Sequence, residues 1–159
     1  MSEKNEAIVR RFFQQGWNNG DLAAFDETIA AHYVNHDPSS LPNVKPTLEG
    51  LKQLAVAYRA AFPDLNITID DLIANHEKVV VRYTLAGTHL GELMGIAPTN
   101  RKVFATGISI YLLECGKIVE GWTIWDALSL IQLGLWEVSE SLVLMQQLGL
   151  PIPVSPAPR

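Results

Sequence analysis

Apolar residues recur at helical spacing along the first part of the chain. In residues 2–18 they lie three or four positions apart after a serine that can cap them, which predicts an amphipathic helix. A shorter helix is predicted over about 21–31, beginning with an aspartate suited to its N-cap. Residues 33–46 contain three prolines and predict a loop with at most one short extended piece. Helical spacing returns over 48–62, and a proline follows the end of that segment.

In the second part of the chain the period changes from helical to alternating. Alternation with many β-branched and aromatic residues predicts four strands, over residues 65–73, 79–89, 101–113 and 116–126. Turn-forming residues separate the first two strands and again the last two, at 75–78 and 114–117. We therefore expect two hairpins.

Helices followed by an antiparallel sheet are typical of an α+β domain, in which helices cover one side of a curved sheet. The concave side of such a sheet can enclose a mostly apolar pocket with a few polar groups. Two more short helices are expected, over 126–133 and about 138–148. We expect one domain over residues 1–150, and an extended or disordered proline-rich tail over 151–159.

Composition narrows the possible functions. The chain has 159 residues, 48% of them hydrophobic, which is enough for one sizeable core. Its net charge of -5 and scattered basic residues leave no basic stripe, so nucleic acid is not an expected partner. A single cysteine excludes an internal disulfide framework and fits a reducing compartment. No signal peptide or membrane span is recognisable, and we expect a cytoplasmic protein.

The strand over 116–126, GKIVEGWTIWD, contains the strongest candidate for chemistry. Alternation places Asp126 at the end of a largely apolar row with Ile118, Trp122 and Ile124. Its carboxylate is then either the N-cap of the following helix or a general base whose pKa the apolar neighbours raise. The residues alone leave both interpretations open.

Two histidines are further candidates. His36 lies in the proline-rich loop, and His89 ends a strand on the same side as its apolar residues. A lone histidine in such a place is more often structural than catalytic, and two of them near Asp126 weaken that preference. His32 and His36 have the i, i+4 spacing of a metal site, but the segment leads into Asp37-Pro38, where a helix is disfavoured; we expect no metal. Several large side chains either line the pocket or belong to the core: Trp17, Phe62, Met94, Trp122 and Trp125.

Five motifs in order resemble one known family. They are YVNHDP at 33–38, FPDL at 62–65, GTHLGELMGIAPT at 87–99, GKIVEGWTIWD at 116–126 and IQLG at 131–134. Over residues 4–134 the chain resembles the SnoaL-like polyketide cyclases, often labelled ester cyclases. That family belongs to the cone-shaped α+β superfamily of nuclear transport factor 2 and ketosteroid isomerase. The resemblance implies a cone-shaped, curved antiparallel sheet wrapped by the N-terminal helices.

The resemblance also implies an activity. By the family's pattern, Asp126 would be the general acid/base of an intramolecular aldol condensation, with His36 and His89 beside it in the cavity. No cofactor, metal or Schiff-base lysine is implied, and the substrate would be a hydrophobic polyketide-like small molecule. The strand over 103–111 offers hydroxyl groups where characterised cyclases present histidine or glutamine. The expected substrate contacts are Tyr33, Trp17, Phe62, Met94, Thr106 and Trp122.

Other functions remain open on the sequence. The same fold would serve a hydrolase, hydroxylase or isomerase of a hydrophobic ring compound, or a protein that binds such a compound without turnover. A late apolar patch either packs against the chain's own helices or forms the surface of an expected homodimer or higher homo-oligomer. The patch consists of Trp136, Val138, Leu142 and Met145.

Overall fold

A computed structural model describes residues 2–38, 40, 43–93, 95–130 and 147–149 of the chain. The predicted helix over 138–148 lies almost entirely outside the described residues, and the predicted tail over 151–159 lies wholly outside them. The late apolar patch at Trp136 to Met145 also lies outside them. Within the described residues, no helix has the length and apolarity that a membrane crossing requires.

Helices and one sheet make up the described chain, and this confirms the predicted α+β class. The helices are α1 (Ser2–Arg11), the π-helix η1 (Phe12–Asn18), α2 (Leu22–Thr28), α3 (Leu48–Ala61) and α4 (Ala127–Leu130). The strands are β1 (Ile29–His36), β2 (Asn66–Asn75), β3 (Lys78–Thr88), β4 (Lys102–Glu114) and β5 (Lys117–Trp125). The four strands expected from alternation are β2 to β5, each within a few residues of its predicted bounds.

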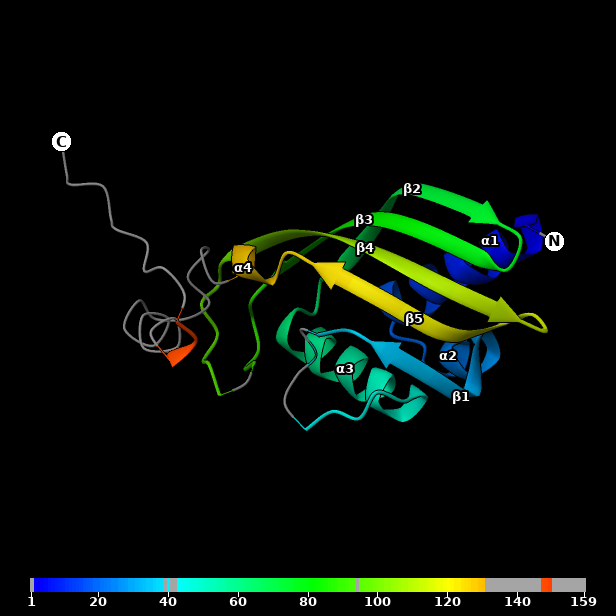
Figure 1. Cartoon of the computed structure of the whole chain (residues 1–159). Helices are drawn as coiled ribbons and strands as arrows, with labels where there is room; N and C mark the ends of the chain where they lie inside the picture. Colours follow the sequence, from blue (N-terminus) through cyan, green and yellow to red (C-terminus); the bar gives the residue numbers. More distant parts are fainter. Residues whose placement is uncertain (1, 39, 41–42, 94, 131–146, 150–159) are drawn as a thin grey trace.

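The sheet order is β1-β5-β4-β3-β2 (Figure 1). Neighbouring strands from β2 to β5 pair antiparallel, and the predicted turns of the β2–β3 and β4–β5 hairpins place His76, Cys115 and Gly116 at positive φ. A left-handed backbone at two successive turn residues, Cys115 and Gly116, fits a tight hairpin between twisted strands. β1 pairs parallel to β5, so the sheet is mixed rather than purely antiparallel.

Strand β1 corrects the helix predicted to about residue 31. Over residues 33–36 it also occupies the start of the predicted loop, which allowed one short extended piece. α2 begins as predicted, with the Asp21 carboxylate accepting from the Ala23 N–H at 3.0 Å, but it ends at Thr28. Ile29 then pairs with Ile118 of β5, and both side chains are fully buried. Long-range pairing and burial of a β-branched residue therefore outweigh the local helical pattern.

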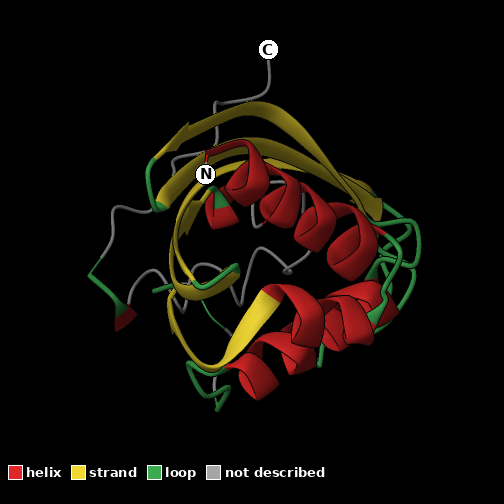
Figure 2. Cartoon of the chain, turned by 90° about the vertical axis from the view of Figure 1, so that its right-hand side faces the viewer, coloured by secondary structure: helices red, strands yellow, loops and turns green. Residues whose placement is uncertain are grey.

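The sheet curves around the N-terminal helices and forms the core with them (Figure 2). β4 alternates almost strictly between buried and exposed residues, as expected for a strand with one face on a core. The largest fully buried side chains include Phe12, Phe25, Ile29 and Ile118. Gly16 lets η1 approach α2 closely, because a Cβ there would lie 2.9 Å from the Phe25 ring.

A bulge in β5 decides which side chains face the interior. Leu112 pairs with Glu120 and Leu113 with Ile118, so Val119 is an extra residue, and Ile118 and Val119 are both buried. Beyond the bulge, Glu120, Trp122, Ile124 and Asp126 point away from the core, while Gly121, Thr123 and Trp125 point toward it. The predicted single face shared by Ile118 and Asp126 is therefore wrong, because one inserted residue reverses the alternation.

Candidate functional site

A cavity lies between the concave face of the sheet and the helices. It has about 920 Å³ of space free of atoms, part of it open to solvent. Its apolar lining includes Phe12, Phe13, Trp17, Leu54, Phe62, Leu85, Val103 and Trp125. Its polar lining consists of Tyr33, Asn35, Asp37, Ser40, Tyr58, Tyr83, Ser109, Tyr111 and Thr123.

All four tyrosines of the chain line this cavity. Two glycines of the sheet make room for them. A Cβ on Gly121 would lie 2.5 Å from the Tyr33 hydroxyl, and a Cβ on Gly107 would lie 2.5 Å from the Tyr83 hydroxyl. These strand glycines therefore allow the tyrosine rings to lie directly against the sheet.

The floor of the cavity carries a cluster of hydroxyl groups. The Ser109 and Thr123 hydroxyls, on neighbouring strands, are 2.8 Å apart. Ser109 also interacts with the hydroxyls of Tyr83 and Tyr111. Burial is the main cause that raises the pKa of Tyr83 to about 12 and that of Tyr111 well above its ordinary value. These tyrosines stay neutral at physiological pH and act as hydrogen-bond donors or acceptors.

Asp37 is the one carboxylate lining the cavity among the described residues. It follows β1 directly and continues its alternation, so Tyr33, Asn35 and Asp37 face the cavity. After burial, the negative charge of Asp37 is the next cause that raises the pKa of Tyr33 and of Tyr58, the latter to about 12. The cavity thus combines one carboxylate with neutral hydroxyl groups in an aromatic surround.

Asp126 is exposed and caps the following helix. The Ser129 N–H donates to Oδ1 of Asp126 at 3.1 Å, and the Ser129 hydroxyl donates to Oδ2. The Asp126 N–H donates to the carbonyl oxygen of Thr106 at 2.8 Å. Of the two interpretations open on the sequence, capping is thus the one that the geometry shows. The Asp126 side chain is not part of the cavity lining.

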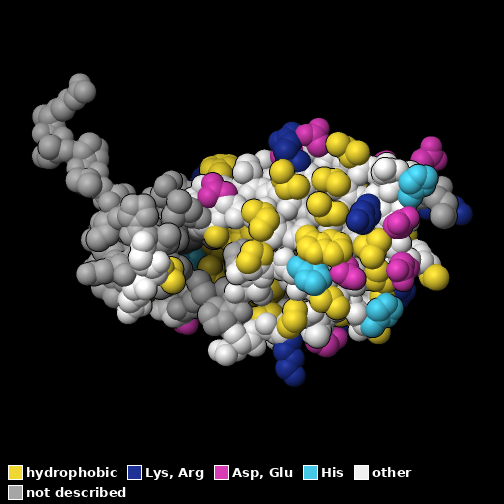
Figure 3. All heavy atoms as spheres, viewed as in Figure 1, with side chains coloured by type: hydrophobic (Ala, Val, Ile, Leu, Met, Phe, Trp, Pro, Cys, Tyr) yellow, Lys and Arg dark blue, Asp and Glu magenta, His cyan; other side chains and the backbone are white. Residues whose placement is uncertain are grey.

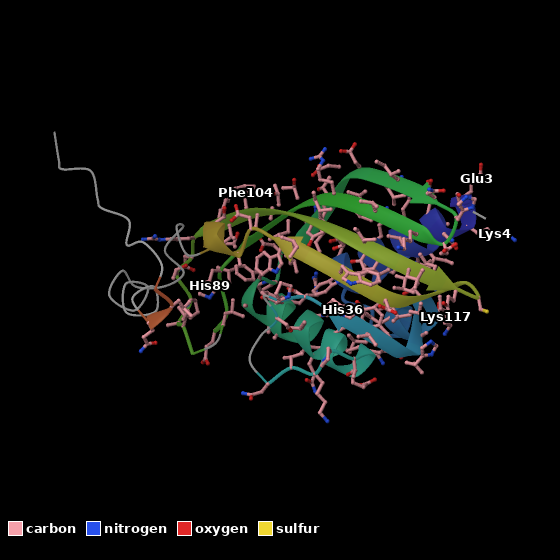
Figure 4. The ribbon with its side chains drawn as sticks, in the orientation of Figure 1. Glu3, Lys4, His36, His89, Phe104 and Lys117 are labelled. Atoms are coloured by element: carbon pink, nitrogen blue, oxygen red, sulfur yellow. The ribbon has the colours of Figure 1, made fainter. Side chains whose placement is uncertain are left out.

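His36 lies on the outer face of the sheet, opposite in direction to Asp37. Its Nε2 is 3.1 Å from a carboxylate oxygen of Glu120, and its ring stacks on Trp122 at 5.1 Å between centroids. All three side chains are partly exposed, and none of them lines the cavity. Figure 4 shows His36 on β1 well separated from His89.

His89 is fully buried just beyond the end of β3 and holds a loop in place. The Thr99 N–H donates to Nδ1 at 3.2 Å, the Thr99 hydroxyl lies 3.0 Å from the same atom, and the ring packs on Phe62. Burial lowers the pKa of His89, and the backbone of Gly91 partly opposes this shift. Its Nε2 has no hydrogen-bond partner among the described residues. The structure therefore does not bring the predicted trio of Asp126, His36 and His89 together around the cavity.

The profile of the SnoaL-like polyketide cyclases matches residues 7–132. The chain belongs to the SnoaL-like polyketide cyclase family. No curated protein sequence matches it significantly.

Solved structures share the fold. A protein from Acidithiobacillus ferrooxidans, proposed to be a polyketide cyclase, is 28% identical, with a TM-score of 0.73 over 83% of this chain and 94% of its own. IdmH from Streptomyces antibioticus, also proposed to be a polyketide cyclase, is 29% identical, with a TM-score of 0.73 over 81% and 96%. AclR from Streptomyces galilaeus, a proposed hydroxylase, is 24% identical, with a TM-score of 0.72 over 84% and 98%. The similarity to AclR shows the fold alone.

The substrate contacts expected in this SnoaL-like chain divide into three groups. Tyr33, Trp17 and Phe62 line the cavity, although substrate binding by them stays a prediction. Thr106 and Trp122 point outward and do not line it. Met94 lies outside the described residues. No group of three or more metal-ligating side chains occurs in the part of the chain that the structure describes.

The sequence predictions missed several polar groups of the SnoaL-like cavity, above all Asp37, Tyr58 and Tyr83. A usable signal was present for Tyr83, which shares the inward parity of Val79 and Val81. Asp37 could be found only if the segment before it was recognised as a strand. Side chains alternate along a strand, so if Tyr33 points inward, Asp37 also points inward and His36 points outward.

Proposed function

We propose that this SnoaL-like chain is a cofactor-independent cyclase that performs acid/base chemistry of the intramolecular aldol type on a hydrophobic, polyketide-like small molecule. The observation that carries the proposal is the cavity itself, in which one carboxylate and several neutral hydroxyls face a largely aromatic space. Family membership supports a cyclase role on this fold.

The proposed chemistry begins at a C–H bond next to a carbonyl group. A carboxylate removes such a proton, and hydroxyl donors stabilise the oxygen of the resulting enolate. An apolar cavity holds a flexible substrate in a conformer that brings the enolate carbon to a second carbonyl. Ring closure without loss of water is an isomerisation, and a following loss of water would make the reaction lyase-like.

Two assignments of the carboxylate compete. The family's pattern favours Asp126 with His36 and His89, whereas the cavity lining contains Asp37 and none of those three. The Asp126 carboxylate interacts with Ser129 through both oxygens, so substrate access to it would require α4 to lose its cap. Asp126 therefore has the weaker geometric support.

The proposed reaction is tested with hydrophobic compounds of one to three rings that carry a β-keto ester and a second carbonyl placed for six-membered ring closure. We expect the protein to convert at least one of them to a product of equal mass, or of that mass less water, resolved by chromatography and mass spectrometry. Fluorescence of the cavity residues Trp17 and Trp125 reports binding separately. Binding without conversion would contradict the cyclase and favour a non-catalytic binding protein. Cleavage or oxygen insertion would favour the hydrolase or hydroxylase alternative.

The expected homo-oligomer belongs to the same proposal, and the outer face of the sheet is the surface that fits it. Ile108 pairs with Ile124 and Ile110 with Trp122, and all four side chains are exposed on that face together with Phe104. Figure 3 shows hydrophobic side chains gathered over these strands. α1, α2 and α3 lie on the opposite face (Figure 2). In a two-fold interface the same surface of each copy faces the other, so each copy must offer both hydrogen-bond donors and acceptors. The adjacent His36–Glu120 pair supplies one of each.

Replacing both Ile108 and Ile124 by lysine is expected to convert the oligomer to monomer, because paired lysines cannot be desolvated against a second copy. Light scattering coupled to size-exclusion chromatography measures the change. Val56→Lys, at an exposed position of α3, is the matched control and should leave the mass unchanged. A wild-type chain that is monomeric at high micromolar concentration would contradict the proposal.

A further inference from the structure

Proton abstraction from carbon needs a base beside the bound molecule, and the described residues place one carboxylate there. That carboxylate is Asp37, which is partly buried at the end of β1 and lines the cavity with Tyr33 and Asn35. We propose that Asp37, rather than Asp126, is the general base of this site and that Tyr58 donates the hydrogen bond that stabilises the enolate oxygen. The inference rests on the proposed function and names the groups that perform it.

The alternation of β1 supports the assignment of Asp37. Val34 and His36 point outward, since Val34 is 39% exposed and His36 stacks on the outer residue Trp122. The residues between and after them, Asn35 and Asp37, therefore point inward, as the cavity lining shows. Because β1 is hydrogen-bonded to β5, Asp37 reaches the same cavity as Thr123 and Trp125.

Among the four tyrosines, Tyr58 is the one whose hydroxyl is not hydrogen-bonded to another described residue. The Tyr33 hydroxyl donates to Oδ1 of Asn35 at 3.3 Å, and those of Tyr83 and Tyr111 interact with Ser109. Within the described residues, the Tyr58 hydroxyl makes no recorded hydrogen bond, although its ring packs edge-on to Trp125 at 6.3 Å. The pKa of Tyr58 is raised to about 12 by burial and by the charge of Asp37, so Tyr58 keeps its proton and can donate a hydrogen bond to an oxyanion.

The proposed step balances without any other reactant. A carboxylate oxygen of Asp37 forms an O–H bond with the acidic hydrogen of the substrate, and the electrons of the broken C–H bond form the enolate. Tyr58 hydrogen-bonds to the enolate oxygen without giving up its proton. The enolate carbon then forms a C–C bond with a second carbonyl carbon of the same molecule. The π electrons of that carbonyl move to its oxygen, which takes the proton back from Asp37.

Hydrogen–deuterium exchange at carbon tests the base directly, because it needs no cyclisation. The probe is 2-tetralone, a hydrophobic bicyclic ketone, whose exchange at C1 in D₂O is followed by proton NMR with and without protein. We expect Asp37→Asn to lower the protein-catalysed rate about 10²- to 10⁴-fold. Tyr58→Phe, which removes only the hydroxyl, is expected to lower the rate about 10²-fold.

Two further variants make the test specific. Asp126→Asn discriminates between the two carboxylates, and under the Asp37 assignment its rate stays within about twofold of wild type. Asp71→Asn, at an exposed carboxylate paired with Arg82 on β2 and β3, is the matched control for loss of one surface charge. Retained binding of 2-tetralone, measured by tryptophan fluorescence, shows that Asp37→Asn and Tyr58→Phe leave the cavity folded.

The outcomes separate this inference from the proposed function. Exchange by wild type that survives Asp37→Asn overturns the inference and leaves the cyclase proposal in place. Exchange lost in Asp126→Asn but kept in Asp37→Asn restores the family assignment. If wild type binds the probe but catalyses no exchange above buffer, both proposals fail. Should Asp37→Asn not fold, Tyr58→Phe still decides, because an unchanged rate there contradicts the predicted donor.

Discussion

Raising the pH above 10 is expected to unfold this SnoaL-like chain steeply, because all four of its tyrosines line the cavity in neutral form. The pKa of Tyr58 and of Tyr83 is raised from 10.0 to about 12, and the pKa values of Tyr33 and Tyr111 are also raised. Burial is the main cause for each of them.

The sign follows from linkage. Each folded-state pKa lies above its unfolded value, so the stabilisation is complete below pH 10 and is lost as the pH rises through the folded value. The loss is about 1.4 kcal/mol per pH unit for each tyrosine, and about 5.5 kcal/mol per pH unit for the four together. Domains typically have a free energy of unfolding of about 5–15 kcal/mol, and a domain with about 5–10 kcal/mol should unfold between about pH 11 and 12.

Tyrosinate absorbance and circular dichroism recorded in one alkaline titration measure this effect. No tyrosine lies outside the cavity, so the absorbance reports the cavity alone. We expect both signals to change together in one cooperative step. Tyr83→Phe is the control. With one ionisable tyrosine fewer, its free energy of unfolding should fall less steeply with pH, by about 1.4 kcal/mol per pH unit. Smooth tyrosine ionisation near pH 10 with the fold intact would contradict the burial described here.

Phe12→Ala is expected to lower the free energy of unfolding by about 3–5 kcal/mol. The Phe12 side chain is 1% exposed, and its ring packs edge-on against Phe13, Phe25 and Tyr111 at 5.3, 5.4 and 5.7 Å between centroids. The substitution removes these contacts where η1, α2 and β4 meet. Because Phe12 also lines the cavity, the truncated side chain would enlarge it.

Chemical denaturation in urea measures this change, with an unchanged slope as the sign that the two-state transition is preserved. Val56→Ala serves as the control because Val56 is 54% exposed on α3, where alanine is a good helix former. That variant should differ from wild type by less than about 0.5 kcal/mol. A similar loss in both variants would show that Phe12 is not a central packing residue.

Much of the fold could be predicted from sequence because local patterns determine it. Apolar spacing in residues 2–18 and 48–62 matches the helical segments α1–η1 and α3. Alternation along β2 to β5 reflects one buried and one exposed face of a sheet, and the turns carry residues that tolerate positive φ. The five motifs in order were sufficient for the family.

The candidate site could be predicted less well, because its geometry depends on two non-local features. Strand β1 exists because Ile29 pairs with Ile118, some ninety residues later, and this pairing turns Asp37 inward and His36 outward. The second feature is the bulge at Val119, where the register between β4 and β5 shifts by one residue. It leaves Asp126 on the outer face.

For this protein, then, the sequence by itself determined the α+β class, the strands with their turns, and the family, since each follows from spacing between near neighbours. Only the tertiary structure decided which polar groups meet around the cavity. A side chain's direction in a strand alternates with every residue, so one unforeseen strand and one inserted residue exchange inside for outside. The neighbouring residues His36 and Asp37 show the consequence, because pairing between distant strands directs one to solvent and the other to the candidate site.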